Sequence, residues 1–372
     1  MWHRYLLVGA TLAWLTACTT PYRPPVVVHD SDNIPGIAPL IADSGNKPLD
    51  VVLIHGMCTH DTGWARSAID NLARTIDPGY TANWPDPPPP PEPNRIGVVT
   101  RIAPLAGGTV RFTALVWSPL TAPLKQRLAY DATGTPNDCS QPDNTEANCK
   151  PKRAHFNGLI KDRLMNDCLS DTMIYEGFNH QAIRGAMVQT VLRVIGEQDA
   201  RNGGNPGPLV VVAESLGSKL VFDALNYMLA RPKNDPLALA GQRAAERLAQ
   251  VFMAGNPIPI LGLADEPGNK PLVQVQLVDS LQRFLVLRRS ARLEQRKAMS
   301  KLKLVAFTDP NDLLSYRLLR RDYVSADVDL ANVLVSNRTT YFGLLEDPLG
   351  AHLGYWTNPD VDRLIVHGWA RP

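Results

Sequence analysis

Residues 209–217 read Leu-Val-Val-Val-Ala-Glu-Ser-Leu-Gly, an apolar run followed by an abrupt change of pattern. The run from Leu209 to Ala213 is short, rich in valine and uncharged, which predicts a strand buried on both faces of a sheet. Beyond Ser215, apolar residues recur at helical spacing from Leu216 to Met228. The segment therefore predicts a buried strand that turns sharply into a helix, with a serine at the junction.

The same alternation of strand and helix patterns continues along the chain. Further strands are predicted over residues 50–54, 110–117, 248–254, 302–307 and 330–335, and helices over 181–200 and from Pro359 onward. This alternation predicts an α/β fold with a mostly parallel central sheet and helices on both faces.

Residues 78–175 do not keep this rhythm throughout. Apart from Val98 to Lys125, the stretch is polar, rich in proline and contains three cysteines. The prolines at 85, 87–91 and 93 predict an extended surface segment. We therefore expect an insertion over about 78–175 near one rim of the sheet.

Composition excludes several classes of protein. Lysine and arginine number 38 against 36 acidic residues, a net charge of +2, so no overall positive field exists to hold nucleic acid. With 44% apolar and 20% charged residues the chain is also unlike a disordered protein. Its 372 residues suit one large domain with an insertion, or two domains.

The first residues have the pattern of a secretory signal peptide. A basic start with Arg4 precedes a short, mostly apolar run from Leu6 to Leu15, about half the length of a membrane span. The ending Leu15-Thr16-Ala17-Cys18 resembles the lipobox of bacterial lipoproteins, which implies cleavage before Cys18 and lipidation of that cysteine. Thr19, where aspartate would imply inner-membrane retention in this class, favours the outer membrane facing the periplasm. The alternative is an ordinary signal peptide with an incidental cysteine.

These features divide the chain into a signal peptide over 1–17, a lipidated N-terminus with a flexible tether over 18–47, and a folded domain over 48–372. Four cysteines remain after Cys18, an even number that favours disulfides in the oxidising periplasm. Cys139 and Cys149 flank a polar loop and are the first expected pair, which leaves Cys58 with Cys168. Spacing alone leaves all three pairings of the four cysteines open.

The strand–serine–helix segment resembles the α/β-hydrolase family in its lipase and esterase branch. The family pattern is Gly-x-Ser-x-Gly; here Ala213 replaces the first glycine and Gly217 is kept. The resemblance covers roughly 48–372 outside the insertion, and it implies an α/β-hydrolase fold with Ser215 as nucleophile. The family order of nucleophile, acid and histidine then points to the residues after the later strands.

The acid and the base are chosen by that order. Asp312 follows the predicted strand over 302–307 and is the expected acid, with Asp309 as the alternative. His352 lies in a predicted loop before the last helix and is the expected base, whereas His367 falls inside that helix. In this chemistry the imidazole takes the serine proton, and the carboxylate fixes and stabilises the imidazole.

The oxyanion formed in such a reaction needs backbone N–H donors. The N–H of Leu216, directly after the nucleophile, is one candidate. His55-Gly56-Met57 resembles the His-Gly oxyanion segment of the family, which makes the N–H of Met57 the second.

The resulting expectation is hydrolysis of carboxylic esters, including lipid or acyl-chain esters, without a cofactor. Acyl transfer or amide hydrolysis by the same triad is the alternative enzyme function. A catalytically inactive envelope interaction protein is the alternative outside enzymes. His55, His60 and Asp61 lack the spacing of a metal site, so no metal is expected.

The interaction alternative would use the insertion and the basic segment over 281–303. Its basic and apolar residues are interleaved, as in a helix that lies on an anionic membrane. We favour a solvated helix with one face on the core.

Overall fold

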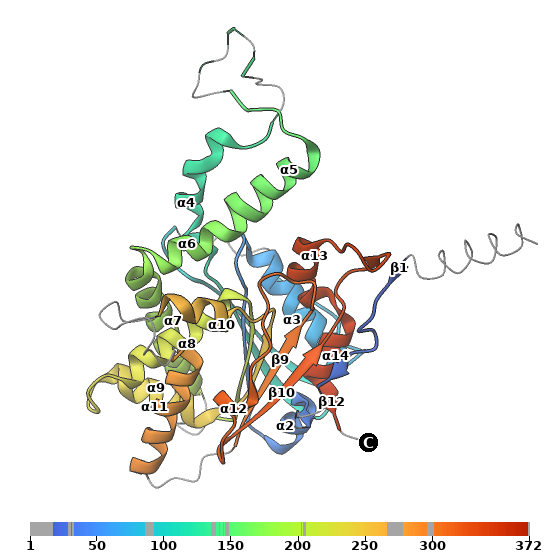
Figure 1. Ribbon diagram of the computed structural model, residues 1–372. Coiled ribbons are helices and arrows are strands. Elements are labelled where there is room, and N and C mark those ends of the chain that lie inside the picture. Colours follow the sequence, from blue (N-terminus) through green and yellow to red (C-terminus); the bar gives the residue numbers. More distant parts are fainter. Residues whose placement is uncertain are drawn as a thin grey trace, which may run out of the picture.

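The computed structural model describes residues 18–28, 31, 33–85, 93–134, 139–140, 142–143, 145, 149–201, 203, 206–265, 278–295 and 301–370. Within these ranges the chain forms an α/β fold in which helices lie on both sides of an eight-stranded sheet (Figure 1). The predicted fold class is confirmed.

The central sheet is mixed but mostly parallel. Its strand order is β2-β10-β9-β8-β7-β4-β6-β5, consistent with an α/β-hydrolase-like topology. The parallel strands are β4 (Leu49–Ile54), β6 (Gly108–Val116), β7 (Leu209–Glu214), β8 (Leu248–Ala254), β9 (Leu302–Thr308) and β10 (Val328–Leu334). The edge strands β5 (Gly97–Leu105) and β2 (Val26–Val27) are antiparallel to their neighbours.

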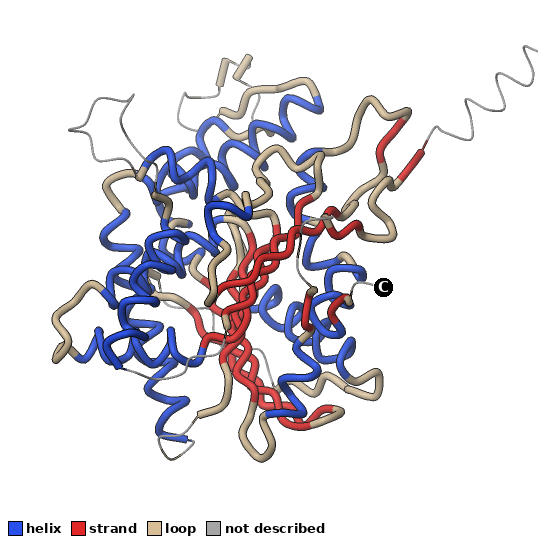
Figure 2. Tube along the Cα trace, turned by 60° about the horizontal axis from the view of Figure 1, so that its bottom comes forward, coloured by secondary structure: helices blue, strands red, loops and turns tan. Residues whose placement is uncertain are grey.

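Two helical layers cover the sheet, and each completes an apolar core (Figure 2). One layer contains α7 (His180–Arg201), α8 (Leu216–Leu229), α9 (Pro236–Arg247) and α11 (Ser280–Gln295). The other contains α2 (Ile37–Asp43), α3 (Thr62–Ile76) and α14 (Pro359–His367). Because both faces are covered, the parallel strands are almost continuously apolar, which is why the run from Leu209 predicted β7 correctly.

The insertion is smaller than predicted. Strands β5 and β6 lie within residues 78–175 but belong to the central sheet, so the part outside the sheet begins at Ser118. That part contains η1 (Ser118–Leu120), α4 (Ala122–Lys125), η2 (Gln126–Asp131), α5 (His155–Leu159), the π-helical η3 (Ile160–Leu169) and α6 (Ser170–Glu176). In Figure 1 it rises from one end of the sheet as an arm. Of the predicted extended proline segment, residues 86–92 lie outside the described ranges.

The segment over 18–47 differs from the predicted tether, because its described residues pack on the domain. Strand β2 extends the sheet beside β10, and β3 (Ile34–Pro35) pairs with β12 (Gly368–Trp369). Ile34, Ile37 and Ile41 are buried in the core against the α14 side. Strands of two residues have no detectable period, so the sequence pattern did not reveal them.

Both expected disulfides are present, Cys58–Cys168 and Cys139–Cys149. Disulfides of this kind suggest a protein outside the cytoplasm. None of the helices within the described ranges combines the length and the apolar character that a membrane span needs.

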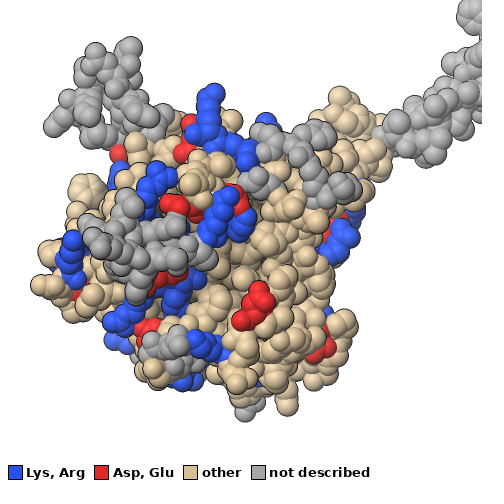
Figure 3. Space-filling model, turned by 90° about the horizontal axis from the view of Figure 1, so that it is seen from below, with Lys and Arg blue, Asp and Glu red and all other residues tan. Residues whose placement is uncertain are grey.

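The basic segment forms α11 over its first part, while residues 296–300 lie outside the described ranges. Leu281 and Phe284 are buried against α8, as expected of a helix with one face on the core. On the face of the molecule in Figure 3, lysine and arginine side chains are interspersed with acidic ones and form no single positive field.

Candidate active site

Ser215 occupies the tight turn between β7 and α8. Its φ of 46° and ψ of −128° are unusual for a residue with a side chain, a conformation that costs about 1–3 kcal/mol and persists only when neighbours enforce it. The N–H of Ser215 donates to the carbonyl oxygen of Ala254 at 2.8 Å, and the N–H of Ser218 donates back to the Ser215 carbonyl at 3.0 Å. The predicted junction serine is therefore held in a strained turn at the end of the sheet.

Two glycines allow the chain to approach this turn. A Cβ on Gly217 would lie 2.5 Å from the carbonyl oxygen of His55, and a Cβ on Gly56 would lie 2.8 Å from the Cβ of Ser215. Neither position tolerates a side chain without displacement of backbone or of Ser215. The loop after β4 and the serine turn thus pack directly against each other.

Asp312 and His352 meet beyond the ends of β9 and β10. His352 lies in the short helix α13 (Pro348–Leu353), where the sequence predicted a loop; the Asp347 side chain caps this helix by accepting from the N–H of Leu349 at 3.1 Å. His352 Nδ1 donates to Asp312 Oδ1 at 2.8 Å. The sequence thus selected two residues, 40 positions apart, that form a buried acid–histidine pair.

Asp309, the alternative acid, accepts hydrogen bonds from backbone N–H groups. Its Oδ2 accepts from the N–H of Asn337 at 2.7 Å and its Oδ1 from the N–H of Asn311 at 2.9 Å. These bonds hold the loops after β9 and β10 together. His367 is exposed at the end of α14, so neither of the two alternatives takes part in the pair.

The pair shifts the basicity of the imidazole. Burial by itself lowers the pKa of His352, but the hydrogen bond and the charge of Asp312 outweigh it, and the net pKa is raised from the ordinary value. With Nδ1 protonated toward Asp312, the neutral ring has its lone pair on Nε2. His352 is thus arranged to accept a proton at Nε2.

Ser215 Oγ and His352 Nε2 are not hydrogen-bonded to each other in this structure. Both atoms are buried, and neither has a hydrogen-bond partner within the described part of the chain. Ser215 is 1% exposed and His352 2% exposed. Buried polar atoms normally have partners, so a ligand could supply the missing contact at each of these two atoms.

The expected oxyanion donors flank the serine turn. Leu216 is the first residue of α8, so its N–H has no acceptor within the helix. Met57 follows Gly56 in the loop after β4 and is buried beside the turn. Neither N–H has a hydrogen-bond acceptor among the described residues, so both remain available to a ligand oxygen.

His55 holds the Met57 loop in place. Its Nε2 accepts from the N–H of Trp117 at 2.9 Å, and its Nδ1 lies 2.7 Å from the carbonyl oxygen of Gly56. Burial, with the charge of His60 added, lowers the pKa of His55 well below the ordinary value. The ring is therefore neutral, and its two nitrogens join the loop after β4 to the end of β6.

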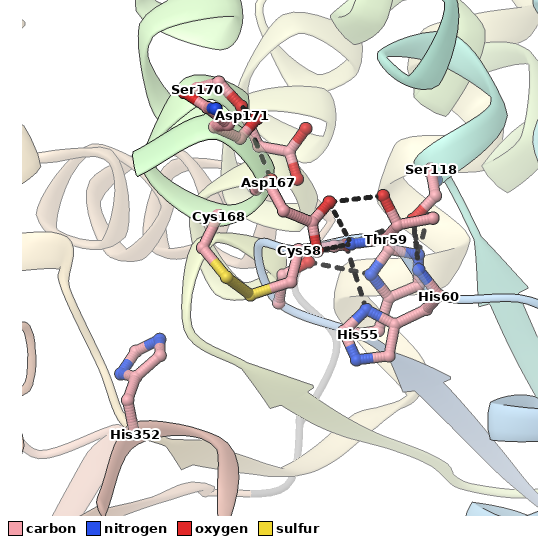
Figure 4. The surroundings of a disulfide bond; sticks show 12 residues. His55, Cys58, Thr59, His60, Ser118, Asp167, Cys168, Ser170, Asp171 and His352 are labelled. Carbon is pink, nitrogen blue, oxygen red and sulfur yellow. Dashed lines mark hydrogen bonds between the residues drawn. A yellow bond between two sulfur atoms is a disulfide. The ribbon is translucent and has the colours of Figure 1, made fainter. Parts of the chain in front are cut away.

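The insertion reaches this loop through a disulfide. Cys58 is bonded to Cys168 at the end of η3, and Asp167 accepts from both the N–H and the hydroxyl of Thr59, at 3.1 and 2.5 Å. Figure 4 shows His352 beside this disulfide, with its ring toward the bond. Ligand-type atoms of Cys58, Asp167 and Cys168 lie within 4.8 Å of one another, but both sulfurs are held in the disulfide and are not free to bind a metal as thiolates. The same bond removes Cys58 from consideration as a nucleophile.

Sequence reasoning missed three side chains of the site. Glu214, directly before Ser215, is buried, and its Oε2 accepts from Trp356 Nε1 at 2.7 Å and from the N–H of Gly56 at 3.4 Å. Tyr355 donates to the second carboxylate oxygen of Asp312 at 2.9 Å. The signal for Glu214 was an acidic residue inside an otherwise buried strand pattern; nothing in the sequence singled out Tyr355 or Trp356.

Comparison with protein-family models finds no match for this chain, and none of the curated proteins matches it.

Proposed function

We propose that this protein is a serine hydrolase of the α/β-hydrolase type that cleaves carboxylic esters through an acyl-enzyme on Ser215. One observation carries the proposal: the strained turn presents Ser215, and the Asp312–His352 pair leaves a buried, unpartnered Nε2. A strained serine at a strand–helix turn and a carboxylate-bound imidazole are the parts that acyl transfer to serine requires.

Each residue of the site has a separate role in this reaction. His352 Nε2 accepts the proton of Ser215 Oγ as the oxygen attacks the ester carbonyl, and later returns it to the departing alkoxide. Asp312 fixes the ring tautomer and stabilises the imidazolium. The N–H groups of Met57 and Leu216 stabilise the tetrahedral oxyanion, a contribution of about 3 kcal/mol each. Water then attacks the acyl-enzyme by the same route and releases the acid.

Burial of the nucleophile supports acyl transfer as a second candidate. Ser215 is 1% exposed, so bulk water has little access to it. Exclusion of water from an acyl-enzyme favours an alcohol or amine acceptor over hydrolysis. The ratio of transferred to hydrolysed product, measured with a long-chain ester and glycerol as acceptor, separates the two reactions.

The proposed setting is the outer membrane, with the domain in the periplasm. Its support is the lipobox before Cys18, the exposure of that cysteine, and the two disulfides. Lipidation of Cys18 would place the site near membrane lipids, which favours acyl-chain esters as substrates. Palmitate incorporation into wild type but not into Cys18→Ala tests the anchor.

Covalent labelling of the full-length protein by a fluorophosphonate tests the nucleophile. Wild type is expected to be labelled on Ser215, identified by mass spectrometry of the peptide. Ser215→Ala and His352→Ala are expected to lose the label, because the first removes the attacking oxygen and the second its base. Ser290→Ala on α11 and the exposed His367→Ala are matched controls that keep it.

The outcomes separate the remaining functions. Labelling followed by turnover of esters of increasing chain length supports the hydrolase. Absence of labelling in folded wild type, checked by circular dichroism, contradicts it and favours an envelope interaction protein that kept the fold without the activity.

A further inference from the structure

Exposed apolar side chains gather beside Cys18. Strand β1 (Cys18–Thr19) is antiparallel to β11 (Thr340–Tyr341), with Cys18 opposite Tyr341. After β11 the chain turns back at once: the N–H of Tyr341 donates to the carbonyl of Leu345 at 2.8 Å, and the N–H of Leu344 donates to the carbonyl of Tyr341 at 2.9 Å. We refer to residues 340–346 as the tip hairpin.

The tip hairpin exposes a group of apolar side chains that are consecutive in the sequence. Tyr341 is 51% exposed, Phe342 66%, Leu344 87% and Leu345 69%. Together with Gly343 they form five consecutive exposed positions without a charge. Single exposed apolar residues are common on protein surfaces, whereas a contiguous group marks a contact surface.

The chain after Cys18 is fastened to the domain. The N–H of Tyr22 donates to Ser336 Oγ at 3.0 Å, and β2 joins the central sheet beside β10. Opposed residues of an antiparallel pair have Cα atoms about 4.5–5.5 Å apart. Any acyl chain attached to Cys18 therefore starts next to Tyr341. In Figures 1 and 2, β1 and the chain around β11 project together from one corner of the molecule.

The base of the tip hairpin contacts the loops of the candidate active site. Glu346 is buried, and its Oε2 accepts from Thr340 Oγ1 at 2.7 Å and from Asn311 Nδ2 at 2.8 Å. Asn311 directly precedes Asp312, and the hairpin continues through Asp347 into the helix that contains His352. The tip hairpin is thus joined directly to the segments that contain the acid and the base.

We propose that the tip hairpin inserts its apolar side chains into the same lipid bilayer as the acyl chains on Cys18. The protein is then bound at two adjacent points and held in one orientation on the membrane. A tyrosine and a phenylalanine suit the headgroup boundary, and the leucines suit the hydrocarbon below it. The inference rests on the proposed lipidation of Cys18, but not on the chemistry at Ser215.

A depth measurement on the lipidated full-length protein tests the insertion. Leu344→Cys is labelled with an environment-sensitive fluorophore after reconstitution into phosphatidylethanolamine–phosphatidylglycerol vesicles. The four cysteines of the disulfides do not react, and lipidation blocks Cys18. The matched control is Leu239→Cys, an exposed leucine on α9 in the helical layer opposite α14.

Lipids brominated on their acyl chains are expected to quench the probe at 344 about twofold or more and to leave the probe at 239 unchanged. Equal, weak quenching at both positions in lipidated protein overturns the inference and leaves the anchor intact. Reaction of the wild-type thiol with the fluorophore, combined with failure to bind vesicles, overturns both the anchor and the inference. Fluorophosphonate labelling of the same samples tests the proposed hydrolase separately.

A second measurement excludes an artefact of the introduced cysteine. Hydrogen exchange of residues 341–345 is measured in the wild-type protein, which carries no introduced cysteine. The rates are compared between protein bound to vesicles and the same protein in solution without vesicles or detergent. Slower exchange confined to this segment in vesicles supports insertion, and unchanged exchange there contradicts it.

Discussion

The Tyr355 hydroxyl donates to Asp312 Oδ2 at 2.9 Å, on the carboxylate oxygen that His352 does not contact. The same hydroxyl accepts from the N–H of Asp309 at 2.8 Å. Asp312 Oδ1 also accepts from the N–H of Leu314 at 2.9 Å. The carboxylate is therefore fixed on both oxygens, so the direction in which it presents a charge to the imidazole is set before any substrate binds.

Removal of that hydroxyl tests how much this fixation matters. Tyr355→Phe deletes a hydrogen bond to a charged group, a loss of about 1.5–3 kcal/mol, so we expect kcat to fall by about tenfold to a hundredfold. Because the bare carboxylate attracts the imidazolium more strongly, the acid limb of the pH profile should move to higher pH. An unchanged profile with normal kcat would mean that the hydrogen bonds of Tyr355 serve the fold and not the reaction.

The choice between the two aspartates is open to direct comparison. Asp312→Asn removes the charge that stabilises the His352 imidazolium, and a fall in kcat of about 10³–10⁴-fold is expected. Asp309→Asn leaves that charge in place but weakens an acceptor for the Asn337 N–H, so stability should fall more than activity. Steady-state kinetics and thermal unfolding of both variants provide the measurement. Equal losses of kcat would contradict the assignment of Asp312 alone as the acid.

The charge of Glu214 should affect how activity depends on pH. Burial raises the pKa of Glu214 to about 7, and its charge in turn raises the pKa of His352. His352 must be neutral to act as a base, so kcat/KM increases as pH rises through its pKa. Glu214→Gln removes the charge, so the acid limb should move to lower pH. Exposed Glu197→Gln on α7 is the control and should leave the profile unchanged.

Glu214 should also make the stability of the fold depend on pH. Stability is expected to fall as pH rises, whereas activity increases. The folded-state pKa of Glu214 exceeds the ordinary 4.5, so between 4.5 and about 7 the native state holds the proton longer than the unfolded state. Glu214 therefore lowers the free energy of unfolding of wild type by about 3 kcal/mol as pH rises across this range, and this contribution is absent from Glu214→Gln. Urea unfolding at pH 5 and pH 8 checks this, and a constant difference between the two proteins would contradict it.

The parts of the fold that the sequence predicted share a physical cause. Buried parallel strands need uninterrupted apolar runs, and a tight turn after such a run needs small neighbours, so β7, Ser215 and Gly217 were recognisable in one local pattern. Asp312 and His352 followed from their order along the chain. Both disulfides were paired correctly because Cys139 and Cys149 flank a short loop.

Other features depend on contacts between distant segments, which no local pattern records. Tyr355 and Asp312 are 43 positions apart, and Glu214 and Trp356 are 142 apart. The segment before β4 looked like a tether because a few isoleucines among prolines have no period. Each of those isoleucines is nevertheless buried in the apolar core of the folded domain. Helix α13 is too short for its pattern to distinguish it from a loop.

The two disulfides should differ in their effect on stability. In the chain-entropy account, the stabilisation by a disulfide increases with the logarithm of the number of residues in the loop that it closes. Cys58 and Cys168 are 110 residues apart, whereas Cys139 and Cys149 are 10 apart. Replacement of both cysteines by serine is expected to cost about 5 kcal/mol for the first pair and about 3 kcal/mol for the second.

Their effects on activity should differ more sharply. Cys58 follows Met57, the expected oxyanion donor, so loss of the Cys58–Cys168 bond frees the loop that must present this N–H. We expect kcat to fall in the Cys58→Ser, Cys168→Ser protein and to stay near wild type in the Cys139→Ser, Cys149→Ser protein, where the short loop lies far along the insertion. Kinetics below the unfolding temperature of both proteins make the comparison. Equal kcat values would show that the Met57 loop is held without the disulfide, by His55 and the bonds from Thr59 to Asp167.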